Sequence, residues 1–317
     1  PKLQAFSYRF LALFLKITLK IAKTAGNTIT AAPPFRKPHL LPAVKPQQQN
    51  SNMTPDQLKI KSVFPRSAQY DLNWVRLHSM GENVLFNLES LTETIPLKKG
   101  MRVLDLGCGK AISSVFLAKE FEVQVWAIDE AISATDNYKR ICEAGCEHLV
   151  TPLQLDARAL PFAEGFFDAV IVVDSYTYFG TDEKYLPYIC RFLKPGGYIG
   201  IVDVCFTHEI ETLQQVPAFL RPDYQDYWYF IHSVEWWKKL WEKTGLVHIT
   251  CSGTLPNADL IRQQYIQDFK GAEDKDPFAK ALKQDQEKFI SFFRLVGRRT
   301  GKDAFLQSFK EEEKNTV

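Results

Sequence analysis

From Thr54 onward, short apolar segments alternate along the chain with segments in which apolar residues recur at helical spacing. Short apolar runs bounded by turn residues predict buried strands, whereas helical spacing predicts helices with one buried face. Helices are predicted at Asn73–Thr94 and Ile112–Phe121 and between most of the later strands. The predicted strands are Met101–Leu106, Val123–Ile128, Val150–Leu155, Ala169–Val173, Tyr198–Val204, Leu246–Cys251 and Ile290–Val296.

Strands that alternate with helices form a mainly parallel sheet with helices on both faces. We therefore predict an α/β fold built on a doubly wound, seven-stranded, mainly parallel sheet, with one domain at residues 56–300. Inserts at about 206–233, which is rich in aromatic residues, and at about 254–288 interrupt the alternation and predict a helical and aromatic lid. The second insert is also a candidate surface for a homodimer. Residues 301–317 form a charged C-terminal tail.

Residues 1–55 differ from the predicted domain and are expected to lie outside the fold. Residues 6–23 are mostly apolar, and their basic residues fall on one face of a helix, namely Arg9, Lys16, Lys20 and Lys23. The longest uncharged apolar run, Phe10–Leu15, is too short to span a bilayer. A basic amphipathic helix is typical of membrane-surface contact or of an organelle-targeting presequence. A Pro- and Gln-rich linker follows, so a leader or tag upstream of a start at Met53 is an equal alternative.

Charge and cysteine content exclude several classes of function. The net charge is +2, but residues 1–55 hold eight basic and no acidic residues, so the remainder is mildly acidic. An acidic body does not favour a groove that follows nucleic-acid phosphates, so no nucleic-acid partner is expected. The six cysteines form no C-x-x-C pair, which predicts neither a disulfide framework nor a metal site. We expect a cytoplasmic protein, or an organelle-targeted or membrane-associated one if the N-terminal segment is a genuine signal.

The loop after the first predicted strand holds the strongest candidate for ligand binding. Gly107 and Gly109 allow the backbone to approach a ligand at the start of a helix. A dinucleotide fingerprint would place Gly or Ala three residues after Gly109, where this chain has Ile112. Asp105 would also repel a pyrophosphate, so the loop suits a cationic ligand better.

The segment from Asp105 to Ala111, D-L-G-C-G-K-A, resembles the first motif of the class I S-adenosylmethionine-dependent methyltransferases, in particular the type 11 small-molecule group. Ala111 replaces the third glycine of that motif. Asp129 lies 20 residues past Gly109, where the acid of this family accepts both ribose hydroxyls. A carboxylate suits that role because it only accepts hydrogen bonds and can take two O–H groups.

The resemblance extends over about residues 68–252 and implies a Rossmann-like fold with S-adenosyl-L-methionine as cofactor. Leu155-Asp156-Ala157 resembles the loop that contacts adenine, and Phe167 to Asp174 resembles the fourth-strand motif. Lys194-Pro195-Gly196-Gly197 resembles the turn before the fifth strand. The implied cofactor-binding residues are Asp105, Gly107, Cys108, Gly109, Asp129, Glu130, Asp156, Ala157 and Asp174.

Residues outside these motifs are candidates for the acceptor site. Ser175 to Gly180 lacks the two prolines of enzymes that methylate adenine or glutamine amino groups, which argues against DNA and peptide-amide acceptors. Tyr178 and His232 are the candidate general bases, although packing or capping is the favoured explanation of His232, because a lone histidine before a helix often has such a role. The candidate acceptor-binding residues are Tyr70, Trp74, Tyr176, Tyr178 and His232.

Together these features predict a methyltransferase that acts on a small-molecule acceptor by in-line displacement. Methyl transfer needs little beyond correct placement of the nucleophile, so the lack of a catalytic triad is no objection. Three alternatives stay open: a lipid-modifying enzyme of cyclopropane-synthase type, a nicotinamide-dependent oxidoreductase and a noncatalytic adenosyl-binding protein. The sequence does not specify which atom accepts the methyl group.

Overall fold

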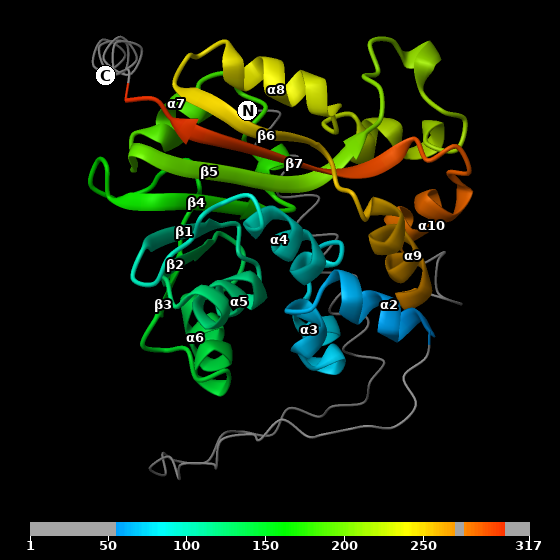
Figure 1. The fold of residues 1–317 in the computed structure, drawn as a ribbon. Coiled ribbons are helices and arrows are strands. Elements are labelled where there is room, and N and C mark those ends of the chain that lie inside the picture. Colours follow the sequence, from blue (N-terminus) through cyan, green and yellow to red (C-terminus); the bar gives the residue numbers. More distant parts are fainter. Residues whose placement is uncertain (1–54, 270–275, 302–317) are drawn as a thin grey trace. The chain divides into compact units, whose positions relative to one another are not determined.

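The computed structural model describes residues 55–269 and 276–301 (Figure 1). The chain divides into residues 1–58 and residues 59–317, and the fold described below belongs to the second unit. A seven-stranded sheet in the order β3-β2-β1-β4-β5-β7-β6 forms its centre. The strands are β1 (Arg102–Leu106), β2 (Gln124–Asp129), β3 (Val150–Gln154), β4 (Phe167–Val173), β5 (Leu193–Phe206), β6 (Val247–Thr254) and β7 (Ile290–Arg299).

The predicted doubly wound, mainly parallel sheet is confirmed. Strands β1 to β5 pair in parallel, and β7 lies antiparallel between β5 and β6. Strand β5 begins earlier than predicted, because Leu193 already pairs with Phe167 of β4. The predicted turn at residues 194–197 is therefore an irregularity inside the strand, where Gly196 has a φ of 76°.

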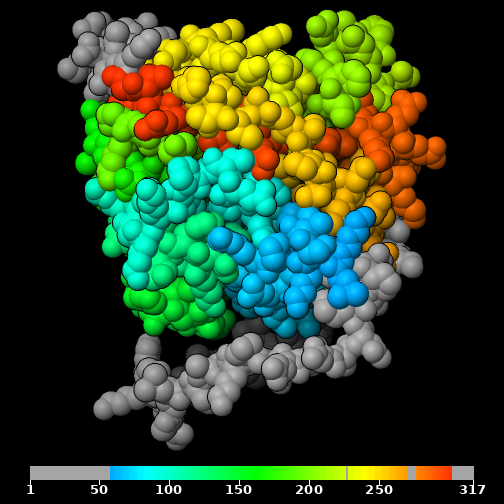
Figure 2. All heavy atoms as spheres, in the orientation of Figure 1, coloured from blue at the N-terminus to red at the C-terminus, as the bar shows by residue number. Residues whose placement is uncertain are grey.

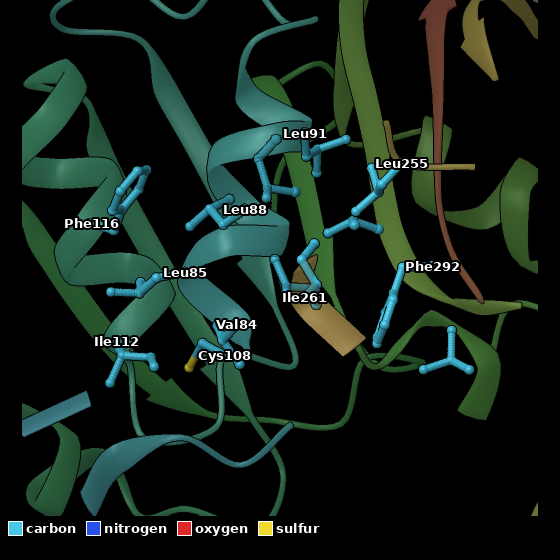
Figure 3. Packing of buried hydrophobic residues seen from close by; sticks show 14 of the residues in the cluster. Val84, Leu85, Leu88, Leu91, Cys108, Ile112, Phe116, Leu255, Ile261 and Phe292 are labelled. Atoms are coloured by element: carbon cyan, nitrogen blue, oxygen red, sulfur yellow. The ribbon is translucent and has the colours of Figure 1, made fainter. Parts of the chain in front are cut away.

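Helices cover both faces of the sheet, as Figure 1 shows. On one face lie α4 (Val84–Thr92), α5 (Ile112–Phe121) and α6 (Ala134–Glu143), and on the other lie α7 (Tyr185–Cys190) and α8 (Val234–Glu242). Each face has its own apolar core. Figure 3 shows Leu85 and Leu88 of α4 packed between Phe116 of α5 and Ile261 of α9 (Ala258–Asp268).

The prediction of one long helix at residues 73–94 is wrong. The structure has two helices, α3 (Leu72–His78) and α4, separated by an irregular segment at 79–83. Ser79 is extended, and Asn83 adopts the left-handed conformation with a φ of 47°. A Cβ at Gly81 would lie 1.7 Å from Oδ2 of Asp174, so the break allows this segment to pack directly against the end of β4.

Both predicted inserts contain ordered elements. The first holds a π-helical segment, η5 (Tyr224–Trp228), and the second holds α9 and α10 (Pro277–Gln284). Helix α9 lies beside the N-terminal helices, as Figures 1 and 2 show, and Arg76 of α3 forms a 2.7 Å ion pair with Asp268. The first of the described helices, α2 (Pro55–Val63), precedes α3. None of the helices that the structure describes is long and apolar enough to cross a membrane.

Candidate active site

The strand order locates the site. From β1 the sheet extends through β2 and β3 in one direction and through β4 and β5 in the other. In an open parallel sheet, ligands bind at the carboxyl ends of the strands where the order reverses, which here is between β1 and β4. The loop after β1, the end of β2 and the segment after β4 meet at this edge.

The glycine loop after β1 is held tightly on two sides. A Cβ at Gly107 would lie 2.4 Å from Oγ of Ser175, which follows β4, and one at Gly109 would lie 3.2 Å from Sδ of Met80. Gly107, Gly109 and Ala111 all have positive φ, the last at 63°. Ala111 thus adopts the conformation that the third glycine would take, and it precedes the first residue of α5.

Asp129 at the end of β2 contacts the glycine loop directly. Its Oδ2 accepts a 2.8 Å hydrogen bond from the Gly109 N–H, and its Oδ1 accepts bonds from the N–H groups of Ala131 and Ile132. An ionised carboxylate has about four acceptor positions, so these three bonds leave one for a ligand. The neighbouring Glu130 has a partly exposed carboxylate, 3.9 Å from Arg158.

Asp105 lies beneath the same loop and is 1% exposed. Ser113 and Ser114 of α5 donate hydrogen bonds of 2.7 and 2.5 Å to its Oδ2, whereas its Oδ1 is buried without a partner. Burial raises the pKa of Asp105 to about 6, against the opposing effect of the two serine hydroxyls. An orphaned acceptor of this kind fits a cationic group such as the amino group of S-adenosylmethionine.

The other predicted cofactor residues have partners that the sequence did not reveal. The carboxylate of Asp156 accepts two hydrogen bonds from the Arg158 guanidinium, at 2.8 and 2.9 Å, and the carbonyl of Ala157 accepts one from Tyr185. The thiol of Cys108 is buried in the apolar core, and burial raises its pKa well above the ordinary value. Cys108 can therefore contribute its backbone to a ligand site, but not its thiol.

Tyr176, a predicted acceptor contact, is instead a core residue. It is 1% exposed, and its ring packs at 5.5 and 5.8 Å from the rings of Trp237 and Trp241 on α8. This environment corrects the prediction, because the side chain points into the apolar layer between sheet and helix. Trp237 and Trp241 are themselves completely buried in that layer.

Tyr70 and Trp74 pack near α5. The Tyr70 ring lies 5.6 Å from that of Phe116, and its hydroxyl donates a 3.1 Å hydrogen bond to Glu120 in the last turn of α5. The Trp74 ring is 6.4 Å from the Tyr70 ring. These contacts account for both residues as packing between the N-terminal segment and α5, and their predicted contact with an acceptor stays a prediction.

The two candidate bases have different surroundings. Tyr178 is half exposed, and its ring lies 5.8 Å from that of Phe230 in the first insert. His232 stacks on Trp236 at 3.6 Å, and its Nδ1 lies 2.8 Å from Oε1 of Glu209. Burial acts to raise the pKa of Glu209, but hydrogen bonds from His232 and Ser233 outweigh it and lower that pKa. Glu209 thus orients the imidazole, a partnership that the sequence analysis missed.

Asp174, a predicted cofactor-binding residue, belongs to a group of carboxyls at this edge whose other members, Glu82 and Asp203, the sequence analysis missed. Asp174 follows β4 with a φ of 54°, and its Oδ2 accepts a 3.0 Å hydrogen bond from the N–H of Glu82. Its carboxyl is also within hydrogen-bonding reach of the carboxyls of Glu82 and of Asp203 on β5. The register of β4 on β5 pairs Val173 with Val202, which makes Asp174 and Asp203 neighbours. The predicted ends of β4 and β5 could have indicated that Asp174 and Asp203 are neighbours, if the two strands had been paired in parallel.

Comparison with known proteins agrees with this geometry. Residues 103–197 match the family model of a methyltransferase domain. Phosphoethanolamine N-methyltransferase 1 of Zea mays is 23% identical over 230 residues, covering 72% of this chain and 39% of that protein. The fatty-acid O-methyltransferase of Mycolicibacterium smegmatis is 34% identical over 122 residues, covering 38% of this chain and 43% of that protein.

Among solved structures, Haemonchus contortus phosphoethanolamine N-methyltransferase 2, in complex with phosphomonomethylethanolamine and S-adenosylhomocysteine, superimposes with a TM-score of 0.58. It is 19% identical, and the match covers 77% of this chain and 57% of that one. The chain spans about two fifths of the length of each of these two curated relatives. The sheet order, the glycine loop with its acid and the family match agree: this chain carries a class I S-adenosylmethionine-dependent methyltransferase domain.

Proposed function

We propose that the protein transfers the methyl group of S-adenosylmethionine to a small-molecule acceptor. The observation that carries the proposal is the hydrogen bond from Gly109 to Asp129, which brings the glycine loop and the acid of β2 together where the strand order reverses. When bound, the cofactor supplies an activated methyl group: the acceptor's lone pair forms the new bond, and the electron pair of the broken C–S bond stays on sulfur. The chain's own task is to bind and orient both molecules.

Each cofactor-binding residue has a distinct role in this proposal. The remaining acceptor position of Asp129 takes one ribose hydroxyl, and the Glu130 carboxylate takes the other. The orphaned Oδ1 of Asp105 attracts the amino group. The lack of side chains at Gly107 and Gly109 lets the loop pack against Ser175 and Met80 and leaves its backbone to face the cofactor. Asp156 and Ala157 line the adenine position, with Arg158 holding the Asp156 carboxylate in place.

The same residues disfavour a nicotinamide dinucleotide. Asp105 and Asp129 approach each other closely enough for the charge of Asp129 to raise the pKa of Asp105, although burial is the larger cause. Asp105, buried beneath the loop, repels a pyrophosphate and attracts a cation, whereas an acid at the position of Asp129 suits the ribose of either cofactor. Ile112, buried at the first position of α5, also replaces the small residue of a dinucleotide fingerprint.

The acceptor atom is a separate question, because the relatives include both an N-methyltransferase and a fatty-acid O-methyltransferase. A lipid acceptor therefore stays among the alternatives. Peripheral membrane contact through residues 6–23 stays a prediction that falls outside the described residues. A homodimer, a cytoplasmic location, the leader at 1–55 and the tail at 301–317 are likewise predictions.

Calorimetric titration with S-adenosylhomocysteine tests the cofactor assignment. We expect micromolar binding to the full chain, weaker binding of NAD, and a loss of about 1–3 kcal/mol in the Asp129→Ala variant, because a charge-assisted hydrogen bond is removed. Glu147→Ala, at an exposed acid on the surface, is the matched control and should bind like the unmodified chain. Equal affinity of Asp129→Ala and the control, or tighter binding of NAD, would contradict the proposal.

A further inference from the structure

Three carboxyl groups meet at the carboxyl edge of the sheet without a cationic partner. Glu82 comes from the break between α3 and α4, Asp174 from the end of β4 and Asp203 from β5. The carboxyl of Asp174 is within hydrogen-bonding reach of both others. Among the ion pairs of the described residues, none involves these three acids, although the chain pairs other acids with Lys or Arg. We call Glu82, Asp174 and Asp203 the carboxyl cluster.

The deepest member of the carboxyl cluster has an unsatisfied oxygen. Asp203 is 4% exposed, and its Oδ1 accepts a 2.8 Å hydrogen bond from the Val204 N–H. Its Oδ2 is buried and accepts no hydrogen bond of normal geometry, although the Thr177 N–H approaches the carboxyl. Its neighbour Asp174 is itself an acceptor and cannot satisfy that oxygen unless a proton is shared between them. A buried acceptor without a donor is rare and needs a ligand or a proton to explain it.

The members of the carboxyl cluster differ in how deeply they are buried. Asp203 is buried, Asp174 and Glu82 are intermediate, and Tyr178 beside them is half exposed. Although half of the Tyr178 residue is exposed, burial of its hydroxyl, followed by the charges of Asp174 and Glu82, raises its pKa well above the ordinary value. The exposed fraction thus increases from Asp203 through Asp174 and Glu82 to Tyr178.

Tyrosine also borders the cluster from the second insert. Burial and the charge of Glu82 raise the pKa of Tyr265 on α9, and the Tyr265 hydroxyl lies 3.5 Å from Oδ1 of Asp276 before α10. Carboxylates bordered by aromatic rings are the combination that binds organic ammonium groups, through charge and through the ring faces. Within the described residues, no group of three or more acids, histidines or cysteines has an arrangement that could hold a metal ion.

We infer that the carboxyl cluster of Glu82, Asp174 and Asp203 binds the amino group of the methyl acceptor, so that the acceptor is an amine. This inference rests on the proposed function. The amine enters as an ammonium ion, which satisfies the Oδ2 of Asp203 and offsets the repulsion among the acids. An ammonium nitrogen has no lone pair, so one N–H proton passes to a carboxylate oxygen of the cluster. The nitrogen keeps the electron pair of that bond and can then form the new bond to carbon.

Three probes of similar shape and different charge test the inference on the full chain with S-adenosylhomocysteine present. Butylamine is cationic at pH 7, 1-butanol is neutral and butyrate is anionic. We expect saturation-transfer NMR to show butylamine binding at least tenfold tighter than 1-butanol, with no binding of butyrate. Equal binding of butylamine and 1-butanol, or preferred binding of butyrate, would overturn the inference.

Two isosteric variants assign the binding to the cluster. Asp203→Asn and Glu82→Gln should each weaken butylamine binding about tenfold and leave the affinity for S-adenosylhomocysteine unchanged. Glu235→Gln, at an exposed acid in the first turn of α8, is the matched control and should change neither affinity. Unchanged butylamine binding in both cluster variants, each shown to be folded by circular dichroism, would overturn the assignment.

The same titrations separate this inference from the proposed function. If the unmodified chain binds butylamine through the cluster but does not bind S-adenosylhomocysteine, the proposed function fails and the cluster is an amine site without a methyl donor. That result overturns the inference that the bound amine is a methyl acceptor. If S-adenosylhomocysteine binds and the probes show no charge preference, only the inference fails.

Discussion

At the scale of single residues, Asp105 shows how a binding site weakens the fold that contains it. Its carboxyl is buried beneath the glycine loop with one oxygen unpartnered, and burial raises its pKa from 3.8 to about 6. The folded chain therefore binds this proton more tightly than the unfolded chain. The resulting stabilisation is fully present below about pH 4 and is lost as the pH rises through about 6.

Replacing Asp105 with Asn should therefore stabilise the chain at neutral pH. The amide cannot ionise, so the variant should gain up to about 3 kcal/mol in free energy of unfolding at pH 7.5 and almost nothing at pH 4. Urea unfolding at the two pH values measures the difference. The variant should also bind S-adenosylhomocysteine more weakly, because the attraction for its amino group is lost. A stability change that is the same at both pH values would contradict the burial argument.

The carboxyl cluster shows what single residues in a sequence conceal. Glu82, Asp174 and Asp203 are far apart along the chain. Asp174 could be predicted from the fourth-strand motif, but Glu82 and Asp203 each resemble an ordinary polar residue at the end or edge of an element. Only the register of β4 on β5 and the break after α3 bring them together. By contrast, Asp105 and Asp129 could be predicted together. The glycine loop that follows Asp105 and an acid 20 residues past Gly109 are parts of one sequence pattern.

At the scale of elements, the sequence pattern predicted correctly those helices whose conformation depends on neighbouring residues in the chain. Helix α5 was predicted with the bounds that the structure shows, because a glycine loop precedes it and helical spacing continues to Phe121. The single helix predicted at 73–94 failed because a tertiary contact decides that region. Gly81 has to approach Asp174 closely, and a continuous helix would not permit this contact. Tyr176 was misplaced for a similar reason, since only the packing of α8 shows that it is buried.

The C-terminus of α5 offers a test of backbone strain. Glu122 ends this helix in the left-handed conformation with a φ of 51°, and its exposed side chain pairs only with the exposed Lys99. Glycine adopts this conformation without strain, so Glu122→Gly should stabilise the chain by about 1 kcal/mol in urea unfolding. Glu122→Ala, which removes the same ion pair but keeps a Cβ, is the control and should change stability little. If the two variants are equally stable, the strain argument is wrong.

At the scale of the whole molecule, one buried arginine ties the second insert to the sheet. Arg262 of α9 lies 3.0 Å from Oδ2 of Asp285, which follows α10, and it also donates to the carbonyls of Leu282, Asp285 and Ile290. Asp285 in turn accepts from the N–H of Ile290 at the start of β7. This network holds α9 and α10 on the sheet, and α9 carries Tyr265 to the carboxyl cluster.

Removing one partner of this network should destabilise the chain strongly. Arg262→Met leaves the Asp285 carboxylate buried without its cation, which costs about 3–5 kcal/mol and should lower Tm by on the order of 10 °C. The double variant with Asp285→Asn should recover part of that loss, because no charge is left buried. Lys288→Met, which breaks only an exposed pair with Asp259, is the control and should shift Tm little. A shift for Arg262→Met no larger than the control would show that the network does not hold the insert.

At the same scale, we propose that S-adenosylmethionine binds where the loop after β1 meets the end of β2. A crystal structure of the chain grown with S-adenosylhomocysteine would show whether it does. We expect electron density for the ligand against Gly107 and Gly109, with its ribose at Asp129 and its amino group on the side of Asp105. Density for the ligand elsewhere on the molecule, with this loop free of it, would show that the proposed site is wrong.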